Sequence, residues 1–286
     1  MNNIPFFILG NPRSGTTLFR LMLNSHPSIV VPPESGFMQW WYNKYGNTTK
    51  LDFDNIVFIE KLVKDILSSK KIEEWSLTTN DLIDIIPDNR PKNYAEFCVL
   101  VYKLYGISKG KKDFIIGDKN NYYINHLDVL NKIYPQAKYI HLVRDGRDVA
   151  SSYLNLNKID SKSVYKPNLP VDIEDIANEW KNNVDAIDSF IKQKSSLKVK
   201  YESLITKPEE TLRIVTDFLQ IDYSHEMLNY YNKDNFDEPN STIDWKKKTM
   251  KKVDSSNLNK YKKVLSIEQI NKFNNIAATT LKRNEY

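Results

Sequence analysis

The stretch FILGNPRSGTTLFRLML, residues 7–23, follows the pattern of a phosphate-binding loop and departs from it at one position. The nucleotide-binding pattern G-x-x-x-x-G-K-[ST] places two glycines, a lysine and a hydroxyl at fixed positions. Gly10, Gly15 and Thr17 are in register with this pattern, but Thr16 stands where the lysine belongs. The stretch therefore predicts an anion-binding loop that lacks the usual phosphate-reading lysine.

The residues around this loop predict a strand before it and a helix after it. Residues 4–9 form a short apolar run that ends at Gly10, which is typical of a buried parallel strand. After the loop, one helical face carries Leu18, Leu21, Met22 and Ser25. The backbone N–H groups of residues 13–17 would then point into the turn and bind an anion. The alternative is a plain strand-turn-helix junction, which any α/β protein contains.

The side chains of the loop favour one kind of anion. Arg13 is the one cation inside the loop, and Gly15 lets the backbone approach a ligand. Three further hydrogen-bond donors are the hydroxyls of Ser14, Thr16 and Thr17. Kinases and NTPases neutralise a γ-phosphate with lysine and Mg²⁺. A sulfuryl group carries less charge, so hydrogen bonds and fixed cations are enough to transfer it, and the missing lysine favours this group.

The ends of the other predicted strands carry no clear metal-binding acidic residue. Directly after the apolar run at 137–143, Arg144 comes before Asp145. Enzymes that transfer phosphoryl groups hold their Mg²⁺ with acidic side chains at such places. We therefore expect chemistry without a metal.

The rest of the chain predicts an α/β fold. Further strands are expected at 114–116, 137–143 and 196–201, and helices at about 56–69, 93–105, 121–133, 172–193, 208–219 and 266–283. Strands that alternate with helices predict a P-loop-like three-layer fold with a central parallel sheet. Residues 37–113 carry helical patterns and little strand signal, so we expect a single domain over 1–286 with a helical cap inserted at about 37–113. Residues 157–170 predict a surface loop and residues 232–257 a mobile segment.

Composition excludes several classes of protein. The net charge of +5, from 41 basic and 36 acidic residues, is too small to favour nucleic-acid binding but suits an enzyme with an anionic ligand. Cys98 is the one cysteine, which excludes an intramolecular disulfide and a cysteine zinc site. No apolar run reaches the roughly 18 residues of a membrane span. Residues 1–10 do not resemble a signal peptide, so we expect a cytoplasmic protein. The sequence leaves its oligomeric state open.

Four segments together resemble the sulfotransferase family, most closely its bacterial and tyrosylprotein branch. They are FFILGNPRSGTTLFRLMLNSHPSIVVPPES (6–35), GDKNNYYINHLDVLNKIYPQAKYIHLVRDGRDVASSYL (117–154), KVKYESLITKPEETLRIVTDFLQI (198–221) and NLNKYKKVLSIEQINKFNNIAATTLKRNEY (257–286). The resemblance covers most of the chain except 37–113 and 157–170. It implies 3′-phosphoadenosine 5′-phosphosulfate as the donor.

The resemblance also implies which residues bind this donor. Its 5′-phosphosulfate would be cradled by Arg13, Ser14, Gly15, Thr16 and Thr17. Arg13 would also face the charge that grows on the departing phosphate. Arg144 and Ser152 match the pair that binds the 3′-phosphate, and Tyr201 matches a position near the nucleotide. Arg144 could instead pair with Asp145 or Asp148, and Tyr201 could be ordinary core. A late basic residue of the family falls among residues 246–252, where Lys251 is one choice.

Two further positions are implied to act on the reaction itself. Lys119 matches a lysine that stabilises charge in the transition state, although a lone lysine is often only solvated. Glu34 matches the general base, with a surface glutamate as the alternative. We expect an apolar surround to raise its pKa, because the aromatic side chains Phe37, Trp40, Trp41 and Tyr42 follow at once. Sulfotransferases of the drug-metabolising type use a histidine base, for which this chain offers His26, His126, His141 and His225.

These features together predict an enzyme that moves a sulfuryl group to an acceptor hydroxyl or amine. The acceptor would be a small molecule, a peptide or a sugar. The sequence does not decide between them, because the acceptor site depends on the unmatched cap at 37–113. Two alternatives remain open at this stage. One is a nucleotide kinase, against which Thr16 speaks, and the other is a non-catalytic nucleotide-binding module.

Overall fold

A computed structural model describes residues 4–47, 51–232 and 238–286 of the chain, and it contains one parallel sheet. Its strands are β1 (Phe6–Leu9), β2 (Ile29–Val30), β3 (Ile115–Lys119), β4 (Tyr139–Val143) and β5 (Ser196–Lys200). The order across the sheet is β2-β3-β1-β4-β5, and every pairing is parallel. β1 therefore lies at the centre, and the phosphate-loop pattern follows directly from its carboxyl end. The predicted α/β fold with a central parallel sheet is confirmed.

Alternate side chains of β1 enter two different cores, one on each face of the sheet. Phe6 and Ile8 pack among side chains of α1 (Thr16–Asn24), α9 (Tyr201–Thr206) and α10 (Pro208–Leu219). Phe7 and Leu9 pack on the opposite face, where Phe7 stacks on Tyr139 with 5.8 Å between ring centroids. Successive strand side chains point to opposite faces, so both faces of a buried strand must be apolar. This explains why residues 6–9 form an unbroken apolar run.

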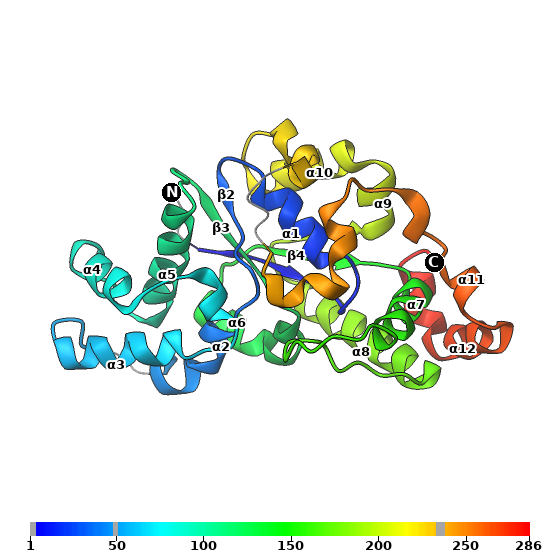
Figure 1. Cartoon of the computed structure of the whole chain (residues 1–286), viewed down its shortest axis with the longest axis horizontal. Coiled ribbons are helices and arrows are strands. Elements are labelled where there is room, and N and C mark those ends of the chain that lie inside the picture. The colour runs from blue at the N-terminus through cyan, green and yellow to red at the C-terminus, as the bar shows by residue number, and fades with distance from the viewer. Residues whose placement is uncertain (1–3, 48–50, 233–237) are drawn as a thin grey trace.

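The stretch 37–113 is helical, and its described residues contain no strand. Its helices are α2 (Phe37–Trp40), a π-helical turn η1 (Tyr42–Gly46), α3 (Ile56–Leu67), a 3₁₀ turn η2 (Ile72–Trp75), α4 (Thr79–Asn89) and α5 (Tyr94–Ser108). In Figure 1, α3, α4 and α5 gather at one end of the molecule. Their buried side chains join those of Phe7 and Leu9 in one core. The helical cap predicted from the sequence is therefore packed directly on one face of the sheet.

A separate core lies at the other end of the molecule, where α7 (Gly146–Asn157), α8 (Ile173–Ile191), α11 (Tyr261–Val264) and α12 (Ile267–Arg283) meet. Trp180 and Phe273 are buried in it, with 5.8 Å between their ring centroids. In the part of the chain that the structure describes, no helix is both long and apolar enough to cross a membrane.

Several segments differ from the sequence-based prediction. β3 continues past residue 116 because Gly117 and Lys119 pair with Phe6 and Ile8 of β1, which outweighs their weak strand pattern. The predicted helix at 121–133 divides into a 3₁₀ turn η3 (Asn121–His126) and α6 (Leu127–Ile133).

The segment 232–257 contains short 3₁₀ turns in its described part. These are the end of η4 (His225–Asn232), then η5 (Asn240–Trp245), η6 (Lys247–Met250) and η7 (Ser255–Asn257). Residues 233–237 lie outside the described residues, and mobility of the segment stays a prediction.

Candidate active site

A cavity of about 1420 Å³ lies at the carboxyl edge of the sheet. Its position follows from the strand order, because β2 and β3 lie on one side of β1 and the chain then crosses to β4 and β5 on the other side. Open α/β sheets bind ligands at such a point. The predicted site residues that line this cavity are Arg13, Gly15, Thr16, Thr17, Glu34, Arg144, Ser152, Tyr201 and Lys251. Ser14 and Lys119 are each 1% exposed and do not line it directly.

The loop after β1 requires a glycine at position 15. Gly15 has a φ of +93°, in the left-handed region, and a Cβ there would lie 2.4 Å from Tyr201 Cδ2. Arg13 also has a positive φ, of 68°, which is uncommon for a residue with a side chain. The N–H of Ser14 donates to the carbonyl of Asn11 at 3.1 Å. This N–H, which we expected to face the ligand, therefore forms a hydrogen bond within the turn instead. The hydroxyl oxygen of Ser14 is buried and has no hydrogen-bond partner in the described part of the chain.

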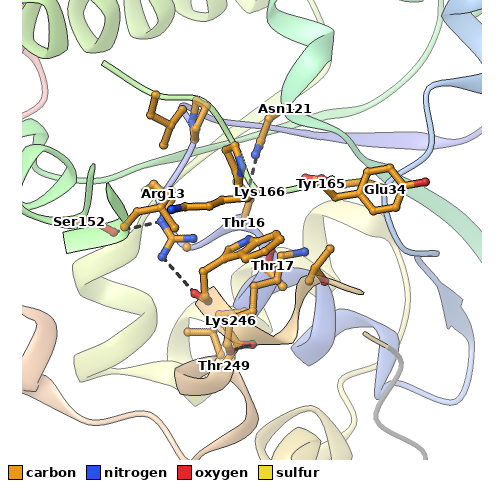
Figure 2. Close-up of a pocket in the computed structure, with 18 of the residues that line it drawn as sticks. Arg13, Thr16, Thr17, Glu34, Asn121, Ser152, Tyr165, Lys166, Lys246 and Thr249 are labelled. Carbon is orange, nitrogen blue, oxygen red and sulfur yellow. Dashed lines mark hydrogen bonds between the residues drawn. The ribbon is translucent and has the colours of Figure 1, made fainter. Parts of the chain in front are cut away.

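The Arg13 side chain joins the loop to two distant segments. Its Nε donates to Ser152 Oγ of α7 at 3.1 Å, and its Nη2 donates to the carbonyl of Trp245 at 3.3 Å (Figure 2). Burial, followed by the nearby charge of Arg144, lowers the pKa of Arg13 to about 10. An anion placed between these two guanidinium groups would relieve their repulsion. Arg13, Ser152 and Arg144 therefore form a positively charged site that a bound anion would stabilise.

Arg144 follows β4 and stacks on Tyr201, with 4.5 Å from its Cζ to the ring centroid. Its Nη1 and Nη2 donate to the carbonyls of Arg13 and Asn257, at 3.1 and 2.8 Å. Its Nε is buried without a hydrogen-bond partner among the described residues.

The alternative partners considered for Arg144 do not account for its position. Asp145 pairs with Arg147 instead, at 2.7 Å. Asp148 Oδ2 lies 4.0 Å from Arg144 Nη2, and both its carboxylate oxygens accept backbone N–H groups, from Asn259 and Tyr261. The charge of Arg144 is therefore only weakly met by these carboxylates, which leaves it available to a ligand.

Glu34 and Lys119 form a buried ion pair beside the first turn of α1. The ammonium of Lys119, at the end of β3, contacts Glu34 Oε1 and lies 3.3 Å from Thr17 Oγ1. The second carboxylate oxygen, Oε2, lies 3.0 Å from the ammonium of Lys71, which belongs to the helical cap. Three segments that are distant in the sequence therefore meet at one carboxylate.

The expectation that an apolar surround raises the pKa of Glu34 is wrong. Burial does raise this pKa, but the charges of Lys119, Lys71 and Lys246 outweigh burial and hold it well below its ordinary value. Burial lowers the pKa of Lys119 to about 8, against the attraction of Glu34. Of the aromatic residues after Glu34, Phe37 is packed in the cap against Trp75, with 5.7 Å between ring centroids, and Trp40 lines the cavity.

Sequence reasoning missed Asn121, which lines the cavity, and a buried ion pair between Arg20 and Glu238, which do not line it. Arg20, 1% exposed on α1, pairs with Glu238 at 2.8 Å, and Glu238 also pairs with Lys246. The hydroxyl of Thr16 lies 3.4 Å from Asn121 Oδ1 (Figure 2). One signal was available: Arg20 falls within the buried stretch of an otherwise apolar helix, where a charge needs a partner.

None of the four histidines, all of which are described, lines the cavity. His26 contacts the carbonyl of Asp222 at 2.8 Å, and His141 is fully buried 3.0 Å from Asp188. These contacts give both side chains a structural explanation.

A sequence model described as the sulfotransferase family matches residues 5–225. The chain belongs to this family. Among curated relatives, protein-tyrosine sulfotransferase 1 of Danio rerio is 26% identical over 237 residues, which cover 78% of this chain and 55% of the relative. Protein-tyrosine sulfotransferase A of Caenorhabditis elegans is 28% identical over 233 residues, covering 79% and 52%. The chain thus spans about half the length of these relatives.

Solved structures of sulfotransferases have the same fold. The sulfotransferase domain from the curacin biosynthetic pathway has a TM-score of 0.65 and 22% identity, covering 97% of both chains. The sulfotransferase domain from the Synechococcus PCC 7002 olefin synthase has a TM-score of 0.62 and 22% identity, covering 96% of this chain and 94% of that one. At 22% identity, this likeness shows a shared fold and nothing further.

Proposed function

We propose that this sulfotransferase takes its sulfuryl group from 3′-phosphoadenosine 5′-phosphosulfate and transfers it to an acceptor hydroxyl or amine without a metal. One observation carries the proposal: a single cavity has two separate groups of anion-binding side chains. The first group is Arg13, Arg144 and Ser152, and the second is the hydroxyls of Thr16 and Thr17 at the start of α1. In Figure 2, Arg13 and Ser152 lie on one side of these hydroxyls, and the candidate base Glu34 lies on the other. A donor with a phosphate at one end and a phosphosulfate at the other would engage both groups at once.

The phosphosulfate end would lie at the start of α1. The hydroxyls of Thr16 and Thr17, the helix N-terminus and the ammonium of Lys119 would surround it. Thr16 in place of lysine suits a sulfonate, which carries less charge than a terminal phosphate.

The 3′-phosphate would lie between α7 and the residue after β4. The unpartnered Nε of Arg144 and the hydroxyl of Ser152 are donors there, and Arg13 adds a second guanidinium. Lys251, which is exposed on the cavity wall, would close the site from the 238–257 segment.

The transfer would be a direct displacement at sulfur. The acceptor oxygen forms its bond to sulfur while the bond between sulfur and the bridging phosphate oxygen breaks, and the electron pair stays on that oxygen. Lys119 and Arg13 would stabilise the charge that develops there. The acceptor's proton would pass to Glu34. Its low pKa keeps Glu34 ionised but makes it a weaker base, and movement of Lys119 towards the sulfuryl group would raise this pKa.

The names of the curated relatives favour a phenolic hydroxyl as the acceptor, in a peptide or in a small molecule. Partly exposed aromatic side chains on the cavity wall, Trp40 and Tyr122, would pack against such a ring. A sugar acceptor is the alternative, because sugars also stack on aromatic rings.

The proposal is tested with sulfur-labelled donor, a chelator and a panel of tyrosine peptides, phenols and sugars. We expect label to reach the phenolic acceptors and the chelator to have no effect. Failure to label any acceptor with this donor, together with Mg²⁺-dependent transfer from ATP, would overturn it.

A further inference from the structure

The helical cap reaches the candidate base through one lysine. Lys71 lies directly before η2 with a φ of 67°, and its ammonium is 3.0 Å from Glu34 Oε2. The Lys71 side chain is 19% exposed and the Glu34 side chain 13% exposed. A lysine side chain loses rotamer freedom when it is fixed in one position. The ion pair with Glu34 offsets this loss of entropy for Lys71.

Lys71 and Lys119 contact different oxygens of Glu34 and have different second neighbours. Lys119 also contacts Thr17, in the helical turn that would receive the transferring group. Lys71 has no hydrogen bond to the loop after β1 among the described residues, and its ammonium also lies 5.7 Å from the centroid of the Tyr165 ring. Lys71 lines the same cavity, but Lys119 contacts Thr17 of the loop, so an anion at the loop would compete with Glu34 for Lys119 first.

We propose that Lys71 is a positioning residue for the transfer: it holds Glu34 by Oε2, so that Oε1 keeps its place when Lys119 turns to the sulfuryl group. This inference rests on the proposed function. It assigns the cap a part in the reaction in addition to shaping the acceptor site. Without Lys71 the carboxylate would rotate, and a displacement of about 1 Å can cost on the order of 100-fold in rate.

The charges around Glu34 make the role of Lys71 measurable by pH. Three ammonium groups face this carboxylate: Lys119 from β3, Lys71 from the cap and Lys246 from the segment between η5 and η6. Glu238 and Tyr122 in turn act on Lys71. Loss of Lys71 removes a positive charge beside Glu34, so protonation of Glu34 should inactivate the enzyme at a higher pH.

The test compares Lys71→Met, Lys71→Gln and Lys71→Arg with Lys64→Met, a change at an exposed lysine of α3. For each, kcat, acceptor KM and affinity for 3′,5′-diphosphoadenosine are measured across pH. We expect the two neutral variants to lose about 10–100-fold in kcat. Their acidic limb should move up by about one pH unit. Lys71→Arg should restore both properties, and Lys64→Met should match the parent chain.

Two results would contradict the inference. One is a kcat and an acidic limb unchanged in both neutral variants, and the other is a rise in acceptor KM alone, which would make Lys71 an acceptor-binding residue. Lys71→Gln keeps a hydrogen-bond donor, and its kcat and acidic limb decide the test if Lys71→Met does not fold. Failure of the parent chain to transfer sulfate would instead contradict the proposed function, because that result precedes any comparison of variants.

Discussion

The ring of Tyr201 lies directly against Gly15, with Arg144 stacked on the same ring at 4.5 Å from its centroid. Gly15 follows β1, Arg144 follows β4, and Tyr201 follows β5, so the ring connects three strand ends at the carboxyl edge of the sheet. Arg144 also donates to the carbonyl of Arg13 inside the loop. The loop after β1 and the proposed 3′-phosphate site are therefore packed against the same ring.

The contact between Gly15 and Tyr201 predicts a large effect of a single methyl group. Gly15→Ala introduces both a left-handed alanine, costing about 1–2 kcal/mol, and a Cβ 2.4 Å from the ring. We expect donor affinity to fall at least about tenfold, as well as a lower free energy of unfolding. Gly110→Ala is the matched control, because Gly110 has a φ of +72° and no atom within 4 Å of its Cβ position. Equal losses of stability in both variants, with donor affinity kept, would contradict this account.

Arg144 and Ser152 should discriminate between donors that differ only in the 3′-phosphate. Arg144→Ala should weaken binding of 3′,5′-diphosphoadenosine by about 2–4 kcal/mol, and Ser152→Ala by roughly 1 kcal/mol. Adenosine 5′-phosphosulfate, which lacks the 3′-phosphate, should hardly respond. Arg147→Ala serves as control, since Arg147 pairs with Asp145 and does not line the cavity. If both ligands weaken equally in a calorimetric titration, these side chains do not bind the 3′-phosphate.

Glu34→Gln keeps the shape of the side chain and removes the proton acceptor. We expect kcat to fall by about 10²–10⁴-fold, which is the usual effect of losing a positioned base. Donor affinity should stay within about threefold, because no 3′-phosphate contact changes. Glu60→Gln, on the exposed side of α3, should behave as the parent chain. A Glu34→Gln enzyme with most of its turnover intact would remove Glu34 from the mechanism.

The buried pair of Glu238 and Arg20 predicts a defined loss of stability in acid. Burial raises the pKa of Glu238, but Lys246 and Arg20 outweigh it and lower this pKa to about 2. A carboxyl whose pKa is lower in the folded state stabilises the fold above its unfolded pKa, and this contribution disappears as the pH falls towards the folded pKa. The contribution amounts to roughly 3 kcal/mol, because a tenfold difference in proton affinity between the two states corresponds to about 1.4 kcal/mol.

Chemical denaturation of Glu238→Gln measures this contribution. The variant should be less stable than the parent chain at neutral pH by roughly 3 kcal/mol, and the difference should shrink between about pH 5 and about pH 3. Glu209→Gln, at an exposed pair with Arg213, should stay within about 1 kcal/mol of the parent at every pH. A constant difference for Glu238→Gln across this range would show that its charge is not what stabilises the fold.

Local patterns were enough to predict the strand-loop-helix unit around residues 6–24 and four of the five strands. β1, β4 and β5 coincide with apolar or alternating runs because each strand carries its own pattern. β2 was missed since it has two residues, and it exists only because Ile29 and Val30 pair with β3. The local sequence does not encode this pairing between distant segments.

The surroundings of Glu34 could not be predicted in the same way. Lys71 and Lys246 approach the site from segments far along the chain. Each is one lysine among 41 basic residues, with no spacing that marks it. The aromatic run after Glu34 predicted an apolar surround, but the Phe37 side chain packs in the core of the cap instead. Electrostatics at this site thus depends on tertiary contacts that the local sequence does not encode.

Isothermal titration calorimetry with 3′,5′-diphosphoadenosine and with ATP tests the central claim most directly, because it needs no knowledge of the acceptor. The account predicts that 3′,5′-diphosphoadenosine binds at least about 100-fold more tightly than ATP. It also predicts that EDTA leaves this affinity unchanged. Binding of ATP with equal or greater affinity, and only in the presence of Mg²⁺, would contradict it.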